Sequence, residues 1–208
     1  MKNTFQVALT NVLLFALIAI CIAGCSKKAT LPPLGADATI LAFGDSLTFG
    51  TGASPESSYP VILKSLINRS VVIHGVPGEV SRDGLSRLPA VLDEVQPKLL
   101  LLCHGGNDFL QKQPEADVAA NVRAMVKLAQ DKNIDVVIIA TPRPGFRVNV
   151  PDFYAAIAKE FSIPIETEIL RDILTDNSLK SDLIHPNAAG YRKLAERIAE
   201  LLKKAGAV

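Results

Sequence analysis

Short apolar runs recur along the chain, and a segment of helical length separates each run from the next. Within each run the apolar residues are continuous, as in strands that are covered on both faces of a sheet. Parallel strands need a crossover connection, which is usually a helix. The pattern therefore predicts a three-layer α/β/α sandwich around a mostly parallel, five-stranded sheet. The expected strands are residues 40–43, 71–73, 99–103, 136–140 and, more weakly, 163–165.

The segments between these runs have the amphipathic spacing of surface helices. Pro60 near the start of the first segment, and Asn187 just ahead of two alanines, stand where helices commonly begin. We find no internal repeat and no second core, so a single domain is expected from residue 38 to 206. The predicted helices are residues 58–68, 81–95, 116–131, 150–161 and 187–204.

The first 24 residues predict a lipoprotein signal peptide. Lys2 is the only charge before residue 27, and residues 12–23 are nearly all apolar. A run of about 12 residues suits a signal peptide better than a membrane span, which needs roughly 20. Cys25 directly follows Ala23 and Gly24 and resembles the lipidated cysteine of the bacterial lipobox. Ordinary signal cleavage and an uncleaved anchor helix are the alternatives.

Lipidation of Cys25 would attach the protein to a membrane of the bacterial cell envelope. Residues 25–37 would then be a polar tether, and Ser26 is compatible with sorting to the outer membrane or its periplasmic face. Removal of 24 of the 208 residues leaves 184, with 21 basic and 21 acidic side chains. This balance gives no reason to expect nucleic acid as a partner. A monomer is expected, and no internal disulfide can form, because Cys103 is the one cysteine left besides Cys25.

Ser46 stands where the first apolar run gives way to Gly44-Asp45-Ser46. In open α/β sheets, ligands bind outside the carboxyl ends of the strands. A serine at this edge is a candidate nucleophile if the chain also supplies a base, a group that orients the base, and donors for an oxyanion.

One of the three histidines is the best candidate for the base. His74 and His104 follow apolar runs, but His185 has a carboxylate close behind it in a loop, at Asp182, and Pro186 stiffens that turn. The spacing Asp-x-x-His is common in loops. Alone, it could equally be a surface aspartate and a histidine at the entry to a helix.

Two glycine-containing loops offer candidate oxyanion donors. Asn107 follows two glycines after the third apolar run, and its amide is a neutral donor. Gly78 follows the second run and could expose its backbone N–H. Simple loop geometry would also account for these glycines.

Taken together, four segments resemble the sequence blocks of the GDSL/SGNH hydrolase superfamily, in order. They are Gly44-Asp45-Ser46-Leu47, Gly78, Gly106-Asn107-Asp108 and Asp182-x-x-His185-Pro186. The resemblance extends from residue 40 to the last helix and is strongest to the bacterial thioesterase/lysophospholipase and arylesterase branch. It implies a flavodoxin-like SGNH hydrolase fold and a serine hydrolase that needs no metal or organic cofactor.

The same resemblance implies a role for each matching position. Ser46 would attack the acyl carbonyl, and His185, held by Asp182, would act first as base and then as acid. The oxyanion hole would consist of the N–H groups of Ser46 and Gly78 and the side chain of Asn107.

Three positions depart from the family pattern. Relatives usually carry a small or polar residue at the position of Pro77, and commonly Asp, Thr or Ser at that of Glu79. His74 stands where Asn is common. These departures bear on substrate preference more than on the reaction.

A few further residues invite a functional interpretation. Phe109, Leu110 and Phe146 could wall an acyl pocket or simply anchor their loops. Cys103 beside His104 could be a thiol nucleophile, but a cysteine that closes an apolar strand is more typical of a core. No zinc-ligand spacing and no phosphate-binding GxxxxGK[ST] motif occurs.

The sequence as a whole predicts a lipid-anchored serine esterase of the cell envelope. Its substrates would be small-molecule or lipid acyl esters or thioesters, hydrolysed through an acyl-enzyme. The alternatives are a carbohydrate O-acetylesterase with the same site and a surface lipoprotein that uses the fold only for binding.

Overall fold

Five parallel strands form the central sheet of the computed structural model, which describes residues 29–145 and 148–208. The strands lie in the order β2-β1-β3-β4-β5, and every neighbouring pair is parallel. The chain order reverses direction at β1, between β2 on one side and β3 on the other. Such a point leaves a crevice at the carboxyl ends of the strands. The strands are β1 (Thr39–Gly44), β2 (Ser70–Gly75), β3 (Leu99–Cys103), β4 (Asp135–Ile139) and β5 (Ile165–Glu166).

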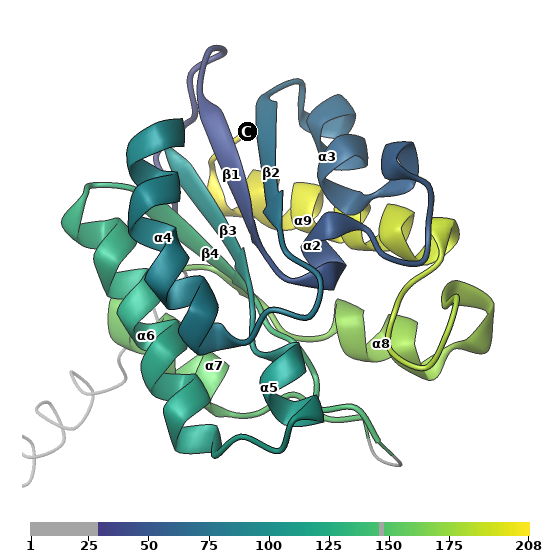
Figure 1. Cartoon of the computed structure of the whole chain (residues 1–208). Coiled ribbons are helices and arrows are strands. Elements are labelled where there is room, and N and C mark those ends of the chain that lie inside the picture. The colour runs from purple at the N-terminus through teal and green to yellow at the C-terminus, as the bar shows by residue number, and fades with distance from the viewer. Residues whose placement is uncertain (1–28, 146–147) are drawn as a thin grey trace, which may run out of the picture.

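Helices cover both faces of this sheet (Figure 1). One face packs against α3 (Tyr59–Ile67), α8 (Ile169–Thr175) and α9 (Ala188–Ala205). The other packs against α4 (Ser81–Val95), α6 (Glu115–Asp131) and α7 (Phe153–Phe161). The predicted three-layer sandwich is therefore confirmed, and all five predicted helices are present within three residues of their expected bounds.

Alternate residues of the central strands enter the two halves of the core. In β1, Ile40 and Ala42 face the α3–α9 side, whereas Leu41 and Phe43 face the α4–α6 side. All five residues of β3 are buried, including Cys103. Burial raises the pKa of the Cys103 thiol well above its ordinary value, which disfavours a reactive thiolate there. Cys103 is thus a core residue.

Short helices that the sequence pattern did not predict follow the carboxyl ends of three strands. They are α2 (Ser46–Phe49) after β1, α5 (Gly106–Leu110) after β3 and α8 after β5. Two 3₁₀ turns, η1 (Pro55–Ser57) and η2 (Asn177–Leu179), complete the connections. One or two turns of helix are too short to produce a readable apolar period. Strand β5 is also short and begins two residues later than the predicted run at 163–165.

The packed domain includes residues before the expected boundary at residue 38. Leu31 and Leu34 are buried, and their N–H groups donate to the carbonyls of Ala205 and Ala207, each at 2.8 Å. Residues 31–37 therefore belong to the fold, at the far end of α9. Cys25 and the expected signal peptide lie outside the described residues. Within residues 29–145 and 148–208, no helix combines the length and the apolarity needed to cross a membrane.

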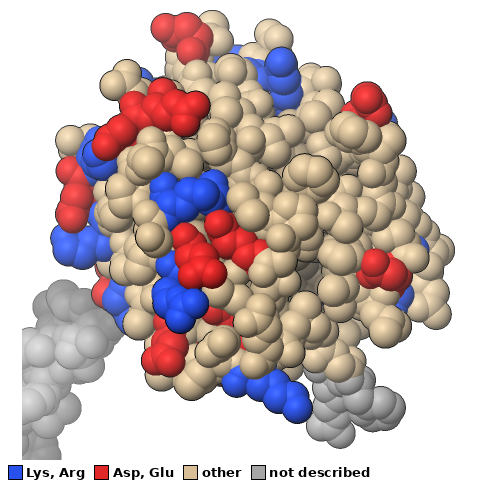
Figure 2. Space-filling view, viewed as in Figure 1, with Lys and Arg blue, Asp and Glu red and all other residues tan. Residues whose placement is uncertain are grey.

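Charged side chains of both signs share the surface. On the face shown in Figure 2, basic and acidic groups lie side by side over α4 and α6. Across the described part of this face, no large area carries a single sign. This described part of one face thus offers no single-sign patch to a strongly charged polymer.

Candidate active site

Ser46 lies at the carboxyl end of β1, as the first residue of α2. Asp45 caps this short helix, because its Oδ1 accepts the Leu47 N–H at 3.0 Å. Gly44 lets β1 approach β3 closely here, since an added Cβ would lie 2.1 Å from the Cys103 carbonyl oxygen. The Gly-Asp-Ser sequence thus combines a close strand contact, a helix cap and a side chain that borders a pocket.

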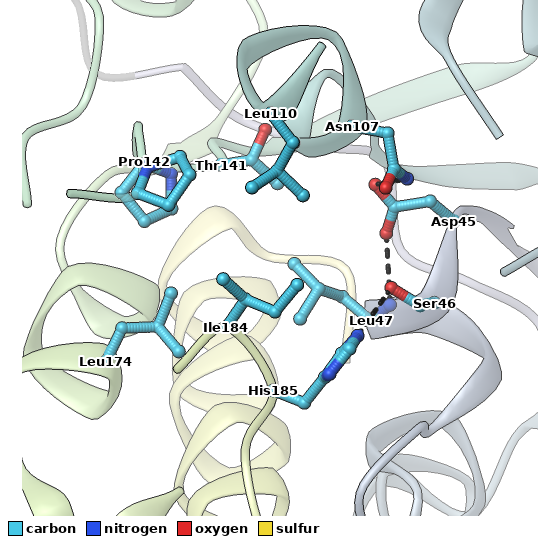
Figure 3. Close-up of a pocket in the computed structure, with 12 residues that line it drawn as sticks. Asp45, Ser46, Leu47, Asn107, Leu110, Thr141, Pro142, Leu174, Ile184 and His185 are labelled. Carbon is cyan, nitrogen blue, oxygen red and sulfur yellow. Dashed lines mark hydrogen bonds between the residues drawn. The ribbon is translucent and has the colours of Figure 1, made fainter. Parts of the chain in front are cut away.

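His185 lies directly beside Ser46, although 139 positions separate them in the chain. The His185 Nε2 is 3.0 Å from the Ser46 Oγ, and its Nδ1 is 2.7 Å from the Asp182 Oδ2 (Figure 3 shows the His185–Ser46 pair). The three side chains therefore form a continuous serine–histidine–aspartate relay.

The loop that carries His185 is folded around Asp182. The Oδ1 of Asp182 accepts the backbone N–H groups of Ile184 and His185, each at 2.8 Å. After Pro186, the side chain of Asn187 caps α9 by accepting the Gly190 N–H at 3.0 Å. This tight turn, rather than a long-range contact, brings the carboxylate and the imidazole together.

The electrostatics of the relay keep Asp182 ionised. Partial burial acts to raise the pKa of this carboxyl, but the hydrogen bond with His185 and two backbone N–H groups outweigh it and lower the pKa. An ionised Asp182 favours the proton on the His185 Nδ1 and leaves the Nε2 free to accept one from Ser46. This arrangement can activate a serine hydroxyl.

Asn107 lies across the pocket from His185, in the first turn of α5. Its Nδ2 donates to the Glu79 carbonyl at 2.9 Å and to the Asp45 Oδ2 at 3.3 Å. Gly105, two residues earlier, has a φ of 114°, and an added Cβ there would lie 2.4 Å from the Tyr154 hydroxyl. A residue with a side chain would not fit this turn.

Gly78 lies in the loop after β2, next to the residue whose carbonyl holds Asn107. Its φ of 82° is in the left-handed region, although an added Cβ would meet nothing within 4 Å. The glycine is therefore required by the backbone turn and not by crowding. The loops of Gly78 and Asn107 thus meet at the same edge of the sheet as Ser46.

An apolar wall lines the pocket beside Ser46 (Figure 3). Leu110, for which the sequence left a pocket wall and a loop anchor both open, is part of that wall. Phe109 does not line the pocket: its ring centre lies 6.5 Å from that of Phe153, and both side chains are partly buried against the core. Phe146 lies outside the described residues. The other apolar members of the wall are Leu47, Pro142, Pro144, Leu174 and Ile184.

Most of this wall was missed at the sequence level. Pro142 and Pro144 follow β4, and the rule that strand ends carry the site would have pointed to them. Leu174 belongs to α8, which the apolar pattern did not reveal.

Among the described residues, no group of three or more His, Cys, Asp and Glu side chains is placed to hold a metal ion.

The chain is similar to several known proteins. Residues 42–193 match the GDSL-like Lipase/Acylhydrolase family. The chain is 30% identical over 173 residues to the thioesterase 1/protease 1/lysophospholipase L1 of Escherichia coli, across 79% of this chain and 83% of that one. It is 28% identical to an arylesterase of Vibrio mimicus, and the alignment covers 79% of this chain and 88% of that one. The crystal structure of TesA superposes with a TM-score of 0.71 at 24% identity, covering 80% of this chain and 99% of that one.

The close contact at Gly44 yields a prediction about stability. We expect Gly44→Ala to lower the free energy of unfolding by roughly 1–3 kcal/mol, because β1 and β3 must separate to admit the methyl group. Urea unfolding followed by circular dichroism measures this. Gly106→Ala is the matched control, since an added Cβ there comes no closer than 3.4 Å to its neighbours. Equal stability of the two variants would contradict the prediction.

Proposed function

Because the chain belongs to the GDSL-like lipase/acylhydrolase family, it is an ester hydrolase, and we propose that Ser46 is its nucleophile. The observation that carries this proposal is the relay from Ser46 through His185 to Asp182, with contacts of 3.0 and 2.7 Å. These distances lie within the reach needed for proton transfer between a nucleophile and its base.

The reaction proceeds in two halves. The His185 Nε2 takes the proton of the Ser46 hydroxyl as its Oγ attacks the acyl carbonyl, and Asp182 stabilises the imidazolium that forms. The tetrahedral intermediate then collapses, and the proton passes to the departing oxygen or sulfur, which leaves an acyl-enzyme. Water, deprotonated by the same histidine, attacks that ester and releases the acid and the free serine.

Three donors are proposed for the oxyanion: the N–H groups of Ser46 and Gly78 and the Nδ2 of Asn107. The Ser46 N–H lies in the first turn of a helix, where N–H groups have no partner within the helix. One N–H of the Asn107 amide is held by the Glu79 carbonyl at 2.9 Å, and the second makes only a longer 3.3 Å contact with Asp45, which it would exchange for the oxyanion. Donors fixed before the reaction do not have to reorganise as charge develops.

The apolar wall supports a substrate with an apolar acyl or leaving group. Leu110 lines the pocket and is 45% exposed, and Leu47, Leu174 and Ile184 line it as well. Apolar side chains of this kind in the site favour acyl esters or thioesters over charged substrates. All parts of the proposed site come from one chain, which supports a monomer as the active form.

Labelling and a substrate series test the proposed reaction. We expect the purified protein to react with a fluorophosphonate probe and to hydrolyse p-nitrophenyl esters, and Ser46→Ala to do neither. A folded wild-type protein that stays unlabelled would support the non-catalytic alternative instead. Within a series from acetate to palmitate, activity confined to acetate would favour the O-acetylesterase alternative, and activity on longer chains the proposal.

The Asn107 side chain gives a second prediction. We expect Asn107→Ala to reduce kcat roughly 100-fold or more, because loss of one oxyanion donor raises the barrier by about 3–4 kcal/mol. Steady-state kinetics on a p-nitrophenyl ester, with circular dichroism as the folding control, measures the effect. Turnover equal to that of the wild type would rule out this role.

We further propose that Cys25 carries a lipid and that the catalytic edge faces away from the anchoring membrane. Helix α9 begins three residues after His185 and extends 18 residues, so its far end is about 27 Å from the catalytic edge. Leu31 pairs with Ala205 at that far end. The six residues from Cys25 to Leu31 span at most roughly 20 Å. A lipid on Cys25 would thus hold the opposite edge of the sheet near the membrane.

Metabolic labelling with an alkyne fatty acid in a bacterial host tests the anchor. The wild-type protein is expected to incorporate the label and to fractionate with membranes, whereas Cys25→Ser is expected to lose both properties and keep its esterase activity. Recovery of the unlabelled wild-type protein in the soluble fraction would contradict lipidation.

A further inference from the structure

A buried ion-pair cluster underlies the loop that carries Gly78. The Glu79 carboxylate accepts two hydrogen bonds from Arg87, from Nε to Oε1 at 2.9 Å and from Nη2 to Oε2 at 2.7 Å. The His104 Nε2 lies 3.1 Å from the same Oε2. The side chains of Glu79 and His104 are only 8% and 0% exposed. A carboxylate buried this far is tolerated only when it is paired.

The cluster joins three separate elements. Glu79 follows β2, Arg87 projects from α4, and His104 directly follows β3, three residues before Asn107. Arg87 is itself fixed, because its guanidinium stacks 4.1 Å from the centre of the Phe43 ring and its Nη2 donates to the His74 carbonyl at 3.4 Å. The cluster is therefore anchored to the strands on either side of the Ser46 loop.

The fold makes specific room for the histidine. Gly84 of α4 faces the His104 ring, and an added Cβ would lie 2.3 Å from its Nε2. The other ring nitrogen, Nδ1, is buried and has no hydrogen-bond partner among the described residues. Among the described residues, the contact with Glu79 is thus the one hydrogen bond of the His104 ring. The buried Nδ1 without a partner costs free energy.

Glu79 touches both proposed oxyanion loops at once. Its backbone continues directly from Gly78, and its carbonyl accepts the Asn107 Nδ2 at 2.9 Å. Movement of Glu79 would shift the Gly78 N–H and release the Asn107 amide together. Small shifts of these donors matter, because a misplacement of about 1 Å in an active site can reduce turnover 100-fold.

We propose that Glu79 is a positioning residue, which His104 and Arg87 hold so that the Gly78 N–H and the Asn107 amide converge on the oxyanion. This inference rests on the proposed oxyanion hole and adds three residues to it that do not touch the substrate. It also assigns a role to Glu79 and His104, which belong neither to the Ser46–His185–Asp182 relay nor to the pocket wall.

Kinetics of Glu79→Gln test the proposal, because this variant keeps the size of the side chain and removes its charge. We expect kcat on a p-nitrophenyl ester to fall roughly 10- to 100-fold. The KM should change less than about threefold, since the oxyanion forms only after the substrate has bound. The rate of fluorophosphonate labelling should fall by the same factor as kcat, because the adduct also places an oxygen in the hole.

A matched variant separates positioning from stability. Glu166 is also a buried glutamate, 4% exposed, and its Oε2 accepts the Arg197 Nε at 2.6 Å, away from the Gly78 loop. Glu166→Gln should therefore lower the thermal midpoint of unfolding while kcat stays within twofold of the wild type. An equal loss of kcat in both variants would overturn the proposal, as would wild-type kcat and labelling in Glu79→Gln.

Two substitutions of His104 provide a route that does not depend on how Glu79→Gln folds. Gln retains an N–H donor toward Glu79, and Leu does not. We expect His104→Gln to retain most of the kcat that His104→Leu loses, and equal kcat in the two would overturn the proposal. Failure of the serine hydrolase itself would look different, because the wild type would then neither turn over nor label.

Discussion

The parallel pairing of β1 with its two neighbours is the constraint on which the rest of the structure depends. Gly44 lies opposite Gly75 of β2 and Cys103 of β3 in the register of the sheet. All three strands therefore end at one level and deliver their following loops to a single edge. Ser46, Gly78 and Asn107 come from those three loops. The geometry of the site is a consequence of the register, since a shift of one strand would separate the proposed nucleophile from its proposed oxyanion donors.

Sequence patterns predicted the features that are encoded locally. The buried strands were readable because continuous β-branched and leucine runs, such as residues 99–103, have few other stable arrangements. Asp182 and His185 were readable as a pair because a three-residue turn suffices to bring them within 2.7 Å. The choice of His185 over His74 and His104 also rested on local sequence. Each of these inferences needs only neighbours in the chain.

Contacts between distant segments were not predictable in the same way. Glu79 was noticed only as a departure from a family pattern, and His104 only as an alternative base. Nothing in either neighbourhood shows that the two meet, because 25 residues and a full helix separate them. Gly84, which makes room for His104, was not singled out at all. The pocket wall was missed for a related reason: it is assembled from α8, the loop after β4 and the His185 loop, and no single stretch has its composition.

The two halves of the site therefore differ in what holds them. The aspartate–histidine pair depends on a surface turn, with Asp182 half exposed. The oxyanion side depends on a buried carboxylate. Burial acts to raise the pKa of Glu79, but hydrogen bonds from His104 and Arg87 and their charges outweigh it and lower the pKa to about 2. A carboxyl whose pKa is lowered by folding stabilises the folded state above its unfolded pKa and loses that effect as the pH falls toward 2. The Glu79 carboxylate therefore stays ionised, and keeps its ion pair with Arg87, until the pH falls close to 2.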